Sequence, residues 1–300
     1  MRAEIDLLLD RRGGAASRTE LLTVLTRNQL DDEVAHGHLV APFARAYCRP
    51  WDADYPPILR RAALISVGQP AALSHVTALR QWRLPTPGDD RTHLTVPIRR
   101  HPIGRSPGLV VHRTRVRTRI VMIEGLATVE AAVAVVRSWP MLRGCDQRAP
   151  AIEAARRRLV SASDLGRVCQ RAPGMPGRTD LALLIAQLDA GCESELELYG
   201  YLKVFDVPGL RHGVRQRVVH VRGNTYRLDL GYEAERVAVE LDGERYHSSR
   251  DQRERDRRRD AAMAAIGWLT LRYSHERLHA DVDGCRRDTL DALATRRVAA

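Results

Sequence analysis

Lysine is almost missing from this chain of 300 residues, although the formal net charge is +11. Arginine carries nearly all of the positive charge, and Lys203 is the only lysine. This absence excludes most catalytic roles that need an amine able to lose its proton near neutral pH. The positive excess favours a polyanionic partner such as nucleic acid, with a solvated basic surface as the alternative.

Cysteine pairs and long apolar runs are missing as well. No two of the five cysteines are separated by two residues, so a zinc site is not expected. An odd count without a disulfide spacing is typical of a reducing compartment and predicts a cytoplasmic protein. No stretch approaches the roughly 18 apolar residues of a membrane span. The apolar run Leu7–Leu9 is too short for a signal peptide.

The composition is otherwise that of a globular protein. Hydrophobic residues make up 44% and charged residues 28% of the chain, which is enough for packed cores, and the length favours two or three domains. The pattern of elements predicts a mixed α/β (α+β) fold. We expect an N-terminal domain, a middle α/β region, a helical connector and a C-terminal α/β domain, with the boundaries 1–52, 53–150, 151–190 and 191–300.

The first domain has the layout of a winged helix-turn-helix. Ser17 can cap a helix with apolar positions at Leu21, Leu22 and Leu25, and a second helix is expected near Asn28–Ala35, ended by Gly37. Two short strands suit residues 38–42 and 46–48. Helix, helix and hairpin within about 35 residues give this layout.

A basic segment follows in the middle region. Between Arg99 and Arg119 there are seven arginines and no acidic residue. In a strand, alternate side chains share a face, so four arginines would line one surface suited to successive phosphates. The alternative is an exposed strand whose charges discourage edge pairing. These four are Arg113, Arg115, Arg117 and Arg119.

Three acidic residues mark the C-terminal region. Asp229 lies in a strand pattern in which Leu228 and Leu230 form the apolar face, and Glu240 and Asp242 share the polar face of a second strand. A five-residue connection allows the two strands to form an antiparallel hairpin. If the polar faces adjoin, three carboxylates meet in a small volume. Their repulsion would be relieved by a hard cation such as Mg²⁺ or Mn²⁺.

Such an ion can polarise a phosphodiester and generate hydroxide at neutral pH. The alternative is that these acids simply decorate an exposed strand face, as isolated acidic residues usually do.

The residues from Asp229 to Arg272 resemble a nuclease family. Asp229, the motif Glu240-x-Asp242-Gly, His247, the charged helix 251–260 and Gly267-Trp-Leu-Thr-Leu-Arg272 are similar to the Vsr-like group of PD-(D/E)XK nucleases. They are closer still to the bacterial family labelled domain of unknown function 559. The resemblance implies an opening helix whose acid lies near the metal. Glu197 is the better match for that acid, with Glu195 in reserve.

One departure from this family concerns the missing lysine. The superfamily's name implies an acid-x-lysine pair, whereas this chain has Glu240-x-Asp242. The resemblance implies that Vsr-like members tolerate the change with help from a histidine. His247 is the candidate, since an imidazole suits proton transfer near neutral pH, and a place in a loop beside Tyr246 is the alternative. Arg272 could neutralise a phosphate or pair with an acid of the charged helix, Asp256 or Asp260.

The N-terminal segment resembles the winged-helix start of AbiEi-type antitoxins of type IV toxin–antitoxin systems. The resemblance rests on the helix spacing and on the strand residues around Leu39 and Tyr47. It implies that the second helix enters a DNA major groove. Arg18, Arg27 and Arg45 are then the candidates for DNA contact. A winged helix used for protein contacts is the alternative.

Three functions are consistent with these patterns. The first is a DNA-binding protein with a Mg²⁺-dependent (or Mn²⁺-dependent) endonuclease domain that hydrolyses or nicks DNA phosphodiesters. The second is a catalytically inactive DNA-binding transcriptional regulator or antitoxin, supported by the missing lysine. The third is a partner of a cognate toxin protein without DNA contact. The sequence carries no signal for a particular oligomeric state.

Overall fold

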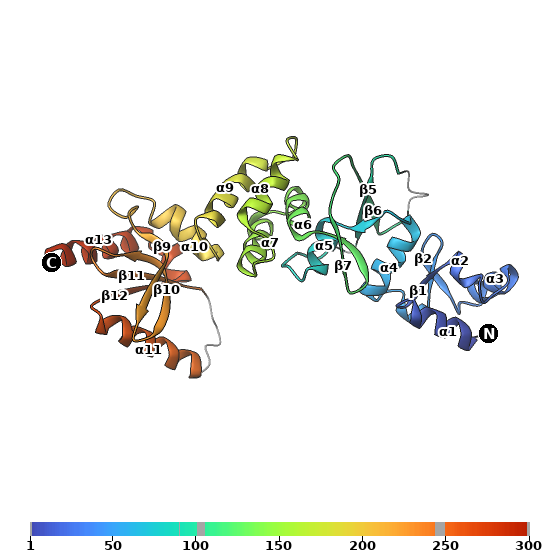
Figure 1. The fold of residues 1–300 in the computed structure, drawn as a ribbon, viewed down its shortest axis with the longest axis horizontal. Helices are drawn as coiled ribbons and strands as arrows, with labels where there is room; N and C mark the ends of the chain where they lie inside the picture. Colours follow the sequence, from blue (N-terminus) through green and yellow to red (C-terminus); the bar gives the residue numbers. More distant parts are fainter. Residues whose placement is uncertain (1, 90, 101–105, 244–249, 299–300) are drawn as a thin grey trace. The chain divides into compact units, whose positions relative to one another are not determined.

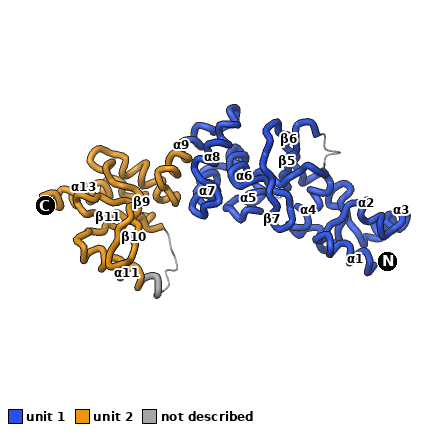
Figure 2. Tube along the Cα trace, viewed as in Figure 1, with its two compact units in different colours: residues 1–182 blue, residues 183–300 orange. Residues whose placement is uncertain are grey.

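The structure is a computed structural model that describes residues 2–89, 91–100, 106–243 and 250–298. The chain divides into two compact units, residues 1–182 and residues 183–300 (Figure 2). Each unit combines helices with β-sheet (Figure 1). The mixed α+β class predicted from the sequence is therefore confirmed.

The N-terminal part of unit 1 contains the expected helices and hairpin. Ser17 and Thr26 form capping boxes with Glu20 and Gln29 at the starts of two helices, and Gly37 adopts φ +71° just beyond the second helix. A first helix, which the sequence pattern did not indicate, precedes them. The elements are α1 (Arg2–Arg11), β1 (Ala15–Ser17), α2 (Arg18–Leu21), α3 (Arg27–Ala35), β2 (Val40–Phe43) and β3 (Ala46–Cys48).

A five-stranded sheet forms the middle of unit 1, with the strand order β6-β5-β4-β8-β7. Its β5–β6 and β4–β8 pairs are parallel and the others antiparallel. Leu94 and Val96 of β5 face a core cluster that includes Ala62 and Ala63 of α4. The elements are η1 (Pro50–Asp52), α4 (Pro56–Val67), β4 (Ala72–Leu73), α5 (His75–Gln81), β5 (Thr92–Pro97), β6 (Leu109–Thr114), β7 (Ile120–Ile123) and β8 (Leu126–Val129).

Helices follow this sheet up to the second unit. Trp139, which is fully buried, lies at the end of the apolar helix α6, and Ser161 caps α8 through a capping box with Asp164. Within the described ranges, no helix is long and apolar enough to cross a membrane. These elements are α6 (Ala131–Ser138), η2 (Trp139–Met141), α7 (Gly144–Arg156), α8 (Ala162–Gln170) and α9 (Arg178–Asp189).

Unit 2 is built on a four-stranded sheet with the order β12-β11-β10-β9. The strands β9, β10 and β11 are antiparallel neighbours, whereas β12 runs parallel to β11, so the chain crosses over through a helix, α11. The elements are α10 (Glu195–Tyr199), the π-helical turn η3 (Gly200–Val204), β9 (Val214–Val221), β10 (Asn224–Tyr232), β11 (Val237–Asp242), α11 (Arg250–Ala265), β12 (Leu269–Ser274), α12 (His275–Ala280) and α13 (Val282–Val298).

Two apolar clusters cover the two faces of this sheet. Leu230, Val237 and Val239 pack in one cluster with residues of α13 such as Leu293. The second cluster joins Ala238 of β11 to Met263 of α11 and to Trp268, which precedes β12, among others. The acidic residues of β11 therefore alternate with buried apolar residues, and the burial of these apolar residues determines which face of the sheet the acids occupy.

The core of unit 2 predicts the effect of a single truncation. Leu230 is 3% exposed, and Leu230→Ala is expected to lower the free energy of unfolding of this unit by about 2–5 kcal/mol. Leu269, in the same sheet but 37% exposed, is the matched control, and Leu269→Ala should cost about 1 kcal/mol or less. Urea denaturation followed by circular dichroism measures both. Equal losses in the two variants would contradict the assignment of Leu230 to the core.

Candidate acidic site of the C-terminal unit

Asp229 and Glu240 come together where the pairing of β10 with β11 stops. The last ladder pair is Leu230 with Val239, so Asp229 and Glu240 are the next residues of the two strands. Here the side chain of Asp229 takes over a backbone role, because its Oδ2 accepts the N–H of Leu241 at 2.8 Å. The carboxylate is thereby fixed between the two strands.

The strand β10 changes face at Asp229. Leu228 pairs with Arg217 of β9 and Leu230 pairs with Arg215, but the register skips Asp229 and the opposite Gln216, which has φ +51°. As a result, Leu228 packs in the cluster with Met263 of α11, whereas Leu230 packs in the opposite cluster.

The prediction that Leu228 and Leu230 share one apolar face is therefore wrong. Regular alternation requires a continuous ladder. The left-handed backbone at Gln216 and the side-chain acceptor at Asp229 interrupt it.

Glu240 is paired with an arginine of the crossover helix. Glu240 is only 5% exposed, and its Oε1 accepts a short hydrogen bond from the guanidinium of Arg259 in α11. The same Nη2 of Arg259 donates to the carbonyl of Arg227 at 2.7 Å. The sequence pattern included Arg259 in the charged helix but gave it no role. Its position one turn after Asp256 and next to Asp260 was the feature of the sequence that could have marked Arg259 as a residue able to pair with an acid.

Asp242 is also paired with an arginine. The parallel register places Glu240 beside Arg272 of β12. From there Arg272 reaches Asp242, with Nη1 3.4 Å from Oδ1, and Asp260 of α11, with Nη2 2.7 Å from Oδ1. Arg272 thus contacts Asp260, one of the two partners predicted for it in the charged helix. Asp242 itself is exposed.

Burial and mutual repulsion favour the protonated forms of Asp229 and Glu240. Burial raises the pKa of Glu240 to about 8; Asp229 and Asp242 add to the increase, while Arg259 and Arg272 oppose it. Burial also raises the pKa of Asp229, although the hydrogen bond from Leu241 works in the other direction. The charges of Arg259 and Arg272 therefore do not fully offset the effect of burial and of the neighbouring acids.

Glu197 lies next to this site and contacts Gln216 of β9, the strand that neighbours β10. It is buried at 7% exposure on α10, where its Oε2 accepts the N–H of Glu193 at 2.9 Å and the side-chain amide of Gln216 at 2.9 Å. The hydroxyl of Tyr201 lies 3.4 Å from the same oxygen and donates to the carbonyl of Asp229 at 2.8 Å. Burial raises the pKa of Glu197, and the charge of Asp229 contributes.

The donor chemistry of the acidic site suits a hard cation, but its arrangement is that of an arginine-paired site. Asp229, Glu240 and Asp242 offer carboxylate oxygens of the kind that Mg²⁺ prefers. Among residues 2–89, 91–100, 106–243 and 250–298, however, no three His, Cys, Asp or Glu side chains are grouped closely enough to hold a metal ion. The predicted helper His247 lies outside the described residues.

The N-terminal candidates differ in how free their side chains are. Arg18 is engaged, because its guanidinium lies 3.2 Å from Asp31 and 3.3 Å from the hydroxyl of Tyr47. Arg27 is exposed at the first position of α3, and Arg45 is exposed in the turn between β2 and β3 with φ +64°. A DNA contact by Arg27 or Arg45 would therefore cost no existing ion pair among the described residues.

The four arginines of the basic segment do not share one strand face. The strand β6 ends at Thr114 and β7 begins at Ile120, so only Arg113 lies in a strand and the prediction of a regular alternation is wrong. Thr114 and Thr118 bond to the backbone around Val116 and turn the chain into a loop. All four side chains nevertheless remain exposed: Arg113, Arg115, Arg117 and Arg119.

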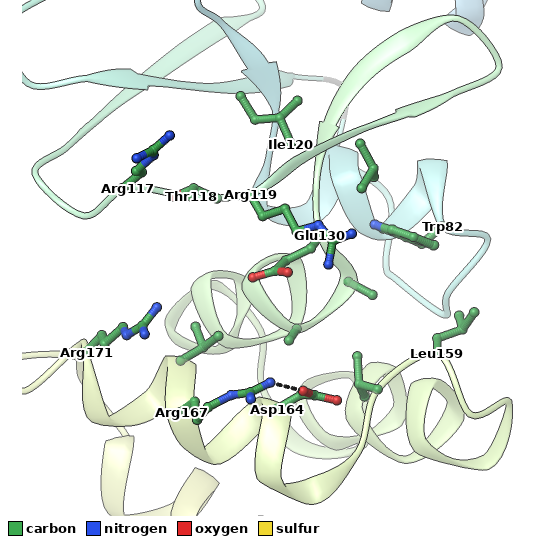
Figure 3. A pocket seen from close by; sticks show the side chains of 15 residues that line it. Trp82, Arg117, Thr118, Arg119, Ile120, Glu130, Leu159, Asp164, Arg167 and Arg171 are labelled. Atoms are coloured by element: carbon green, nitrogen blue, oxygen red, sulfur yellow. Dashed lines mark hydrogen bonds and ion pairs between the residues drawn. The ribbon is translucent and has the colours of Figure 1, made fainter.

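This loop borders a large hollow of about 920 Å³ in unit 1. Figure 3 shows Arg119 near Glu130, and Arg167 and Arg171 of the helical region on the other side of the hollow. Asp164 pairs with Arg167 there. The lining is therefore basic on balance.

Comparison with known proteins places the acidic site in a nuclease-like region. Residues 211–293 match the family model REase_MTES_1575, a restriction-endonuclease-like family, and this range contains all three carboxylates. Folds of this kind generally use divalent metals, and a nuclease-like domain implies DNA as a substrate.

Two relatives come from Mycobacterium tuberculosis. They are Uncharacterized protein MT2308 of strain CDC 1551 / Oshkosh and Uncharacterized protein Rv2248 of strain ATCC 25618 / H37Rv. Each is 28% identical to this chain over 253 residues, which covers 82% of this chain and 89% of the relative. Their names assign no activity, so the finding that bears on function is the family match: residues 211–293 of the C-terminal unit are similar to a restriction-endonuclease-like family.

Proposed function

We propose that the chain is a DNA-binding protein whose C-terminal unit hydrolyses or nicks DNA phosphodiesters with the help of Mg²⁺ or Mn²⁺. The observation that carries this proposal is the match of residues 211–293 to a restriction-endonuclease-like family, in a range that contains Asp229, Glu240 and Asp242, whose charges interact. A net charge of +11 supports DNA as the partner.

The three carboxylates would hold the ion, which when bound would polarise a phosphodiester and activate water. Asp229 is already oriented by the N–H of Leu241. The cluster of Glu197, Gln216 and Tyr201 supports the backbone at Asp229 from the other side. Arg272, between Asp242 and Asp260, can turn toward a phosphate because it lies at the edge of the site.

The pairing of Glu240 with Arg259 supports a second function. An arginine remains charged at any physiological pH, so it neutralises a buried carboxylate permanently and competes with a metal ion. A chain that keeps this pair would be a catalytically inactive DNA-binding regulator or antitoxin that uses the nuclease fold as a scaffold. DNA binding would then be independent of Mg²⁺ but sensitive to salt.

Nicking of supercoiled plasmid distinguishes these two functions. With Mg²⁺ the intact chain should nick the plasmid, and Asp229→Asn, Glu240→Gln and Asp242→Asn should each reduce the rate roughly 100-fold or more. Glu233→Gln is the matched control, because Glu233 is an exposed acid of the same hairpin that pairs with Arg217. If the intact chain binds DNA but nicks no form of it with Mg²⁺ or Mn²⁺, the regulator is the better assignment.

Removal of Arg259 tests whether the carboxylates can take up a cation. In Arg259→Met, Glu240 loses its partner, so the variant should be less stable without metal, by about 1–3 kcal/mol. Mn²⁺ should raise its melting temperature more than that of the intact chain, because the ion replaces the missing charge. The control is Arg258→Met, whose side chain is exposed and pairs with Glu254. If Mn²⁺ does not change the melting temperature of Arg259→Met, the carboxylates do not bind a metal ion.

The raised pKa of Glu240 predicts how stability depends on pH. Its ordinary value is 4.5 and its folded value about 8, so the folded state binds more protons than the unfolded state between these values. Stability should therefore fall as pH rises from about 5 to about 8, with a limiting slope of about 1.4 kcal/mol per pH unit for this group. Glu240→Gln should flatten the decline, and Glu233→Gln should not. Urea denaturation at about pH 5 and about pH 8 measures the free energy of unfolding of the intact chain and the two variants. Equal changes with pH in all three would refute the assignment of the decline to Glu240.

A further inference from the structure

Arg137 of α6 is a half-buried cation whose side-chain partners, within the described part of the chain, are hydroxyl groups. Its guanidinium donates to the hydroxyls of Thr114 at 3.0 Å, Thr118 at 3.1 Å and Thr95 at 3.4 Å. Among the described residues no carboxylate pairs with it, and burial lowers its pKa without an opposing acid. A buried arginine is normally paired with an acid, so this charge is available to an anion from outside the chain.

The three threonines that contact Arg137 also line a hollow of about 280 Å³. Apolar residues also line the hollow, among them Pro70, Ala72 and Val129. Arg115 and Arg117 of the loop between β6 and β7 line it as well, and both are exposed. The hollow therefore combines apolar residues, a hydroxyl layer backed by Arg137 and two further guanidinium groups. Its volume is near the lower end for small-molecule sites.

A stack of histidines fixes the strand that supports this hollow. The rings of His75 and His112 are stacked with centroids 3.6 Å apart, and Nε2 of His112 lies 2.9 Å from Nδ1 of His93. Asp89 orients His93 through an Oδ2–Nε2 contact of 3.1 Å. His112 is the register partner of Thr95 on β5, so the stack holds the edge strand β6 in place beside the hydroxyl layer.

The histidines are neutral and the local charge is positive. Burial lowers the pKa of His75 to about 2 and that of His112 to about 4, and His93 and Arg137 add to both decreases. Stacked rings next to a guanidinium are a poor site for a metal cation, because the ring nitrogens do not converge and the arginine repels the ion. The chemistry of the site favours an anion.

We infer that this hollow binds a small phosphate ester of about nucleotide size. Its phosphate would lie between Arg115, Arg117 and the threonine hydroxyls backed by Arg137, and its less polar part would lie against Pro70, Ala72 and Val129. Guanidinium and hydroxyl donors are the usual partners of phosphate oxygens. This site lies in unit 1, so it is independent of the acidic site and of the function proposed for it.

Calorimetric titration of the full chain with deoxyadenosine 5′-monophosphate, inorganic phosphate and deoxyadenosine tests the site. The nucleotide should bind more tightly than phosphate, and the nucleoside should not bind. Arg115→Gln/Arg117→Gln removes two exposed guanidinium groups without touching the core, and it should weaken nucleotide binding about tenfold or more. Arg137→Met should weaken it at least as much, with the melting temperature recorded to confirm folding.

Arg119→Gln is the matched control, because Arg119 belongs to the same loop but lines the larger hollow (Figure 3). Its affinity for the nucleotide should stay within about twofold of the intact chain. The proposal is overturned if the nucleotide does not bind, or if the double variant binds it as well as the intact chain. It is also overturned if only duplex DNA, and no small phosphate ester, responds to the loss of Arg115 and Arg117.

Discussion

The carboxylate of Asp229 receives the backbone N–H of Leu241, a donor that a carbonyl of the neighbouring strand would otherwise accept. A buried N–H must have a partner, so this one bond determines where the ladder between β10 and β11 ends. It also determines which residue of β11 faces the gap, and that residue is Glu240. The skipped register pair with Gln216 and the hydrogen bond from Tyr201 both involve this same residue, Asp229 of β10. The arrangement of acids in unit 2 therefore depends on a side chain that replaces a piece of main chain.

Charge balance in this site is achieved without lysine. A buried lysine can lose its proton and act as a base, whereas a guanidinium cannot. Arg259 and Arg272 therefore serve as permanent counter-charges, and proton exchange falls to the acids themselves. Glu240 is one such acid, because burial raises its pKa to about 8. The use of arginine in place of lysine thus affects both the stability of the site and the chemistry that it can perform.

Local signals in the sequence predicted much of the fold. Capping residues such as Ser17 mark helix starts through bonds within one turn, and the spacing of Glu240 and Asp242 follows from the period of a strand. Other features failed because they depend on distant partners. The alternation around Leu228 breaks where the ladder to β9 skips the pair of Asp229 and Gln216, and the basic segment becomes a loop after Thr114. His75, His93 and His112 are far apart in the sequence, and only the sheet register and the start of α5 bring them together.

The crossover helix α11 connects the acidic site to the rest of unit 2. Its neighbouring residues Arg259 and Asp260 contact Glu240 and Arg272 on two adjacent strands, so the helix is attached to the sheet through the same charges that define the site. Any ligand that draws Arg259 away from Glu240 loosens one end of this attachment. Part of the free energy of ligand binding is then spent on releasing α11. Occupation of the site and the mobility of the crossover helix are two aspects of a single equilibrium.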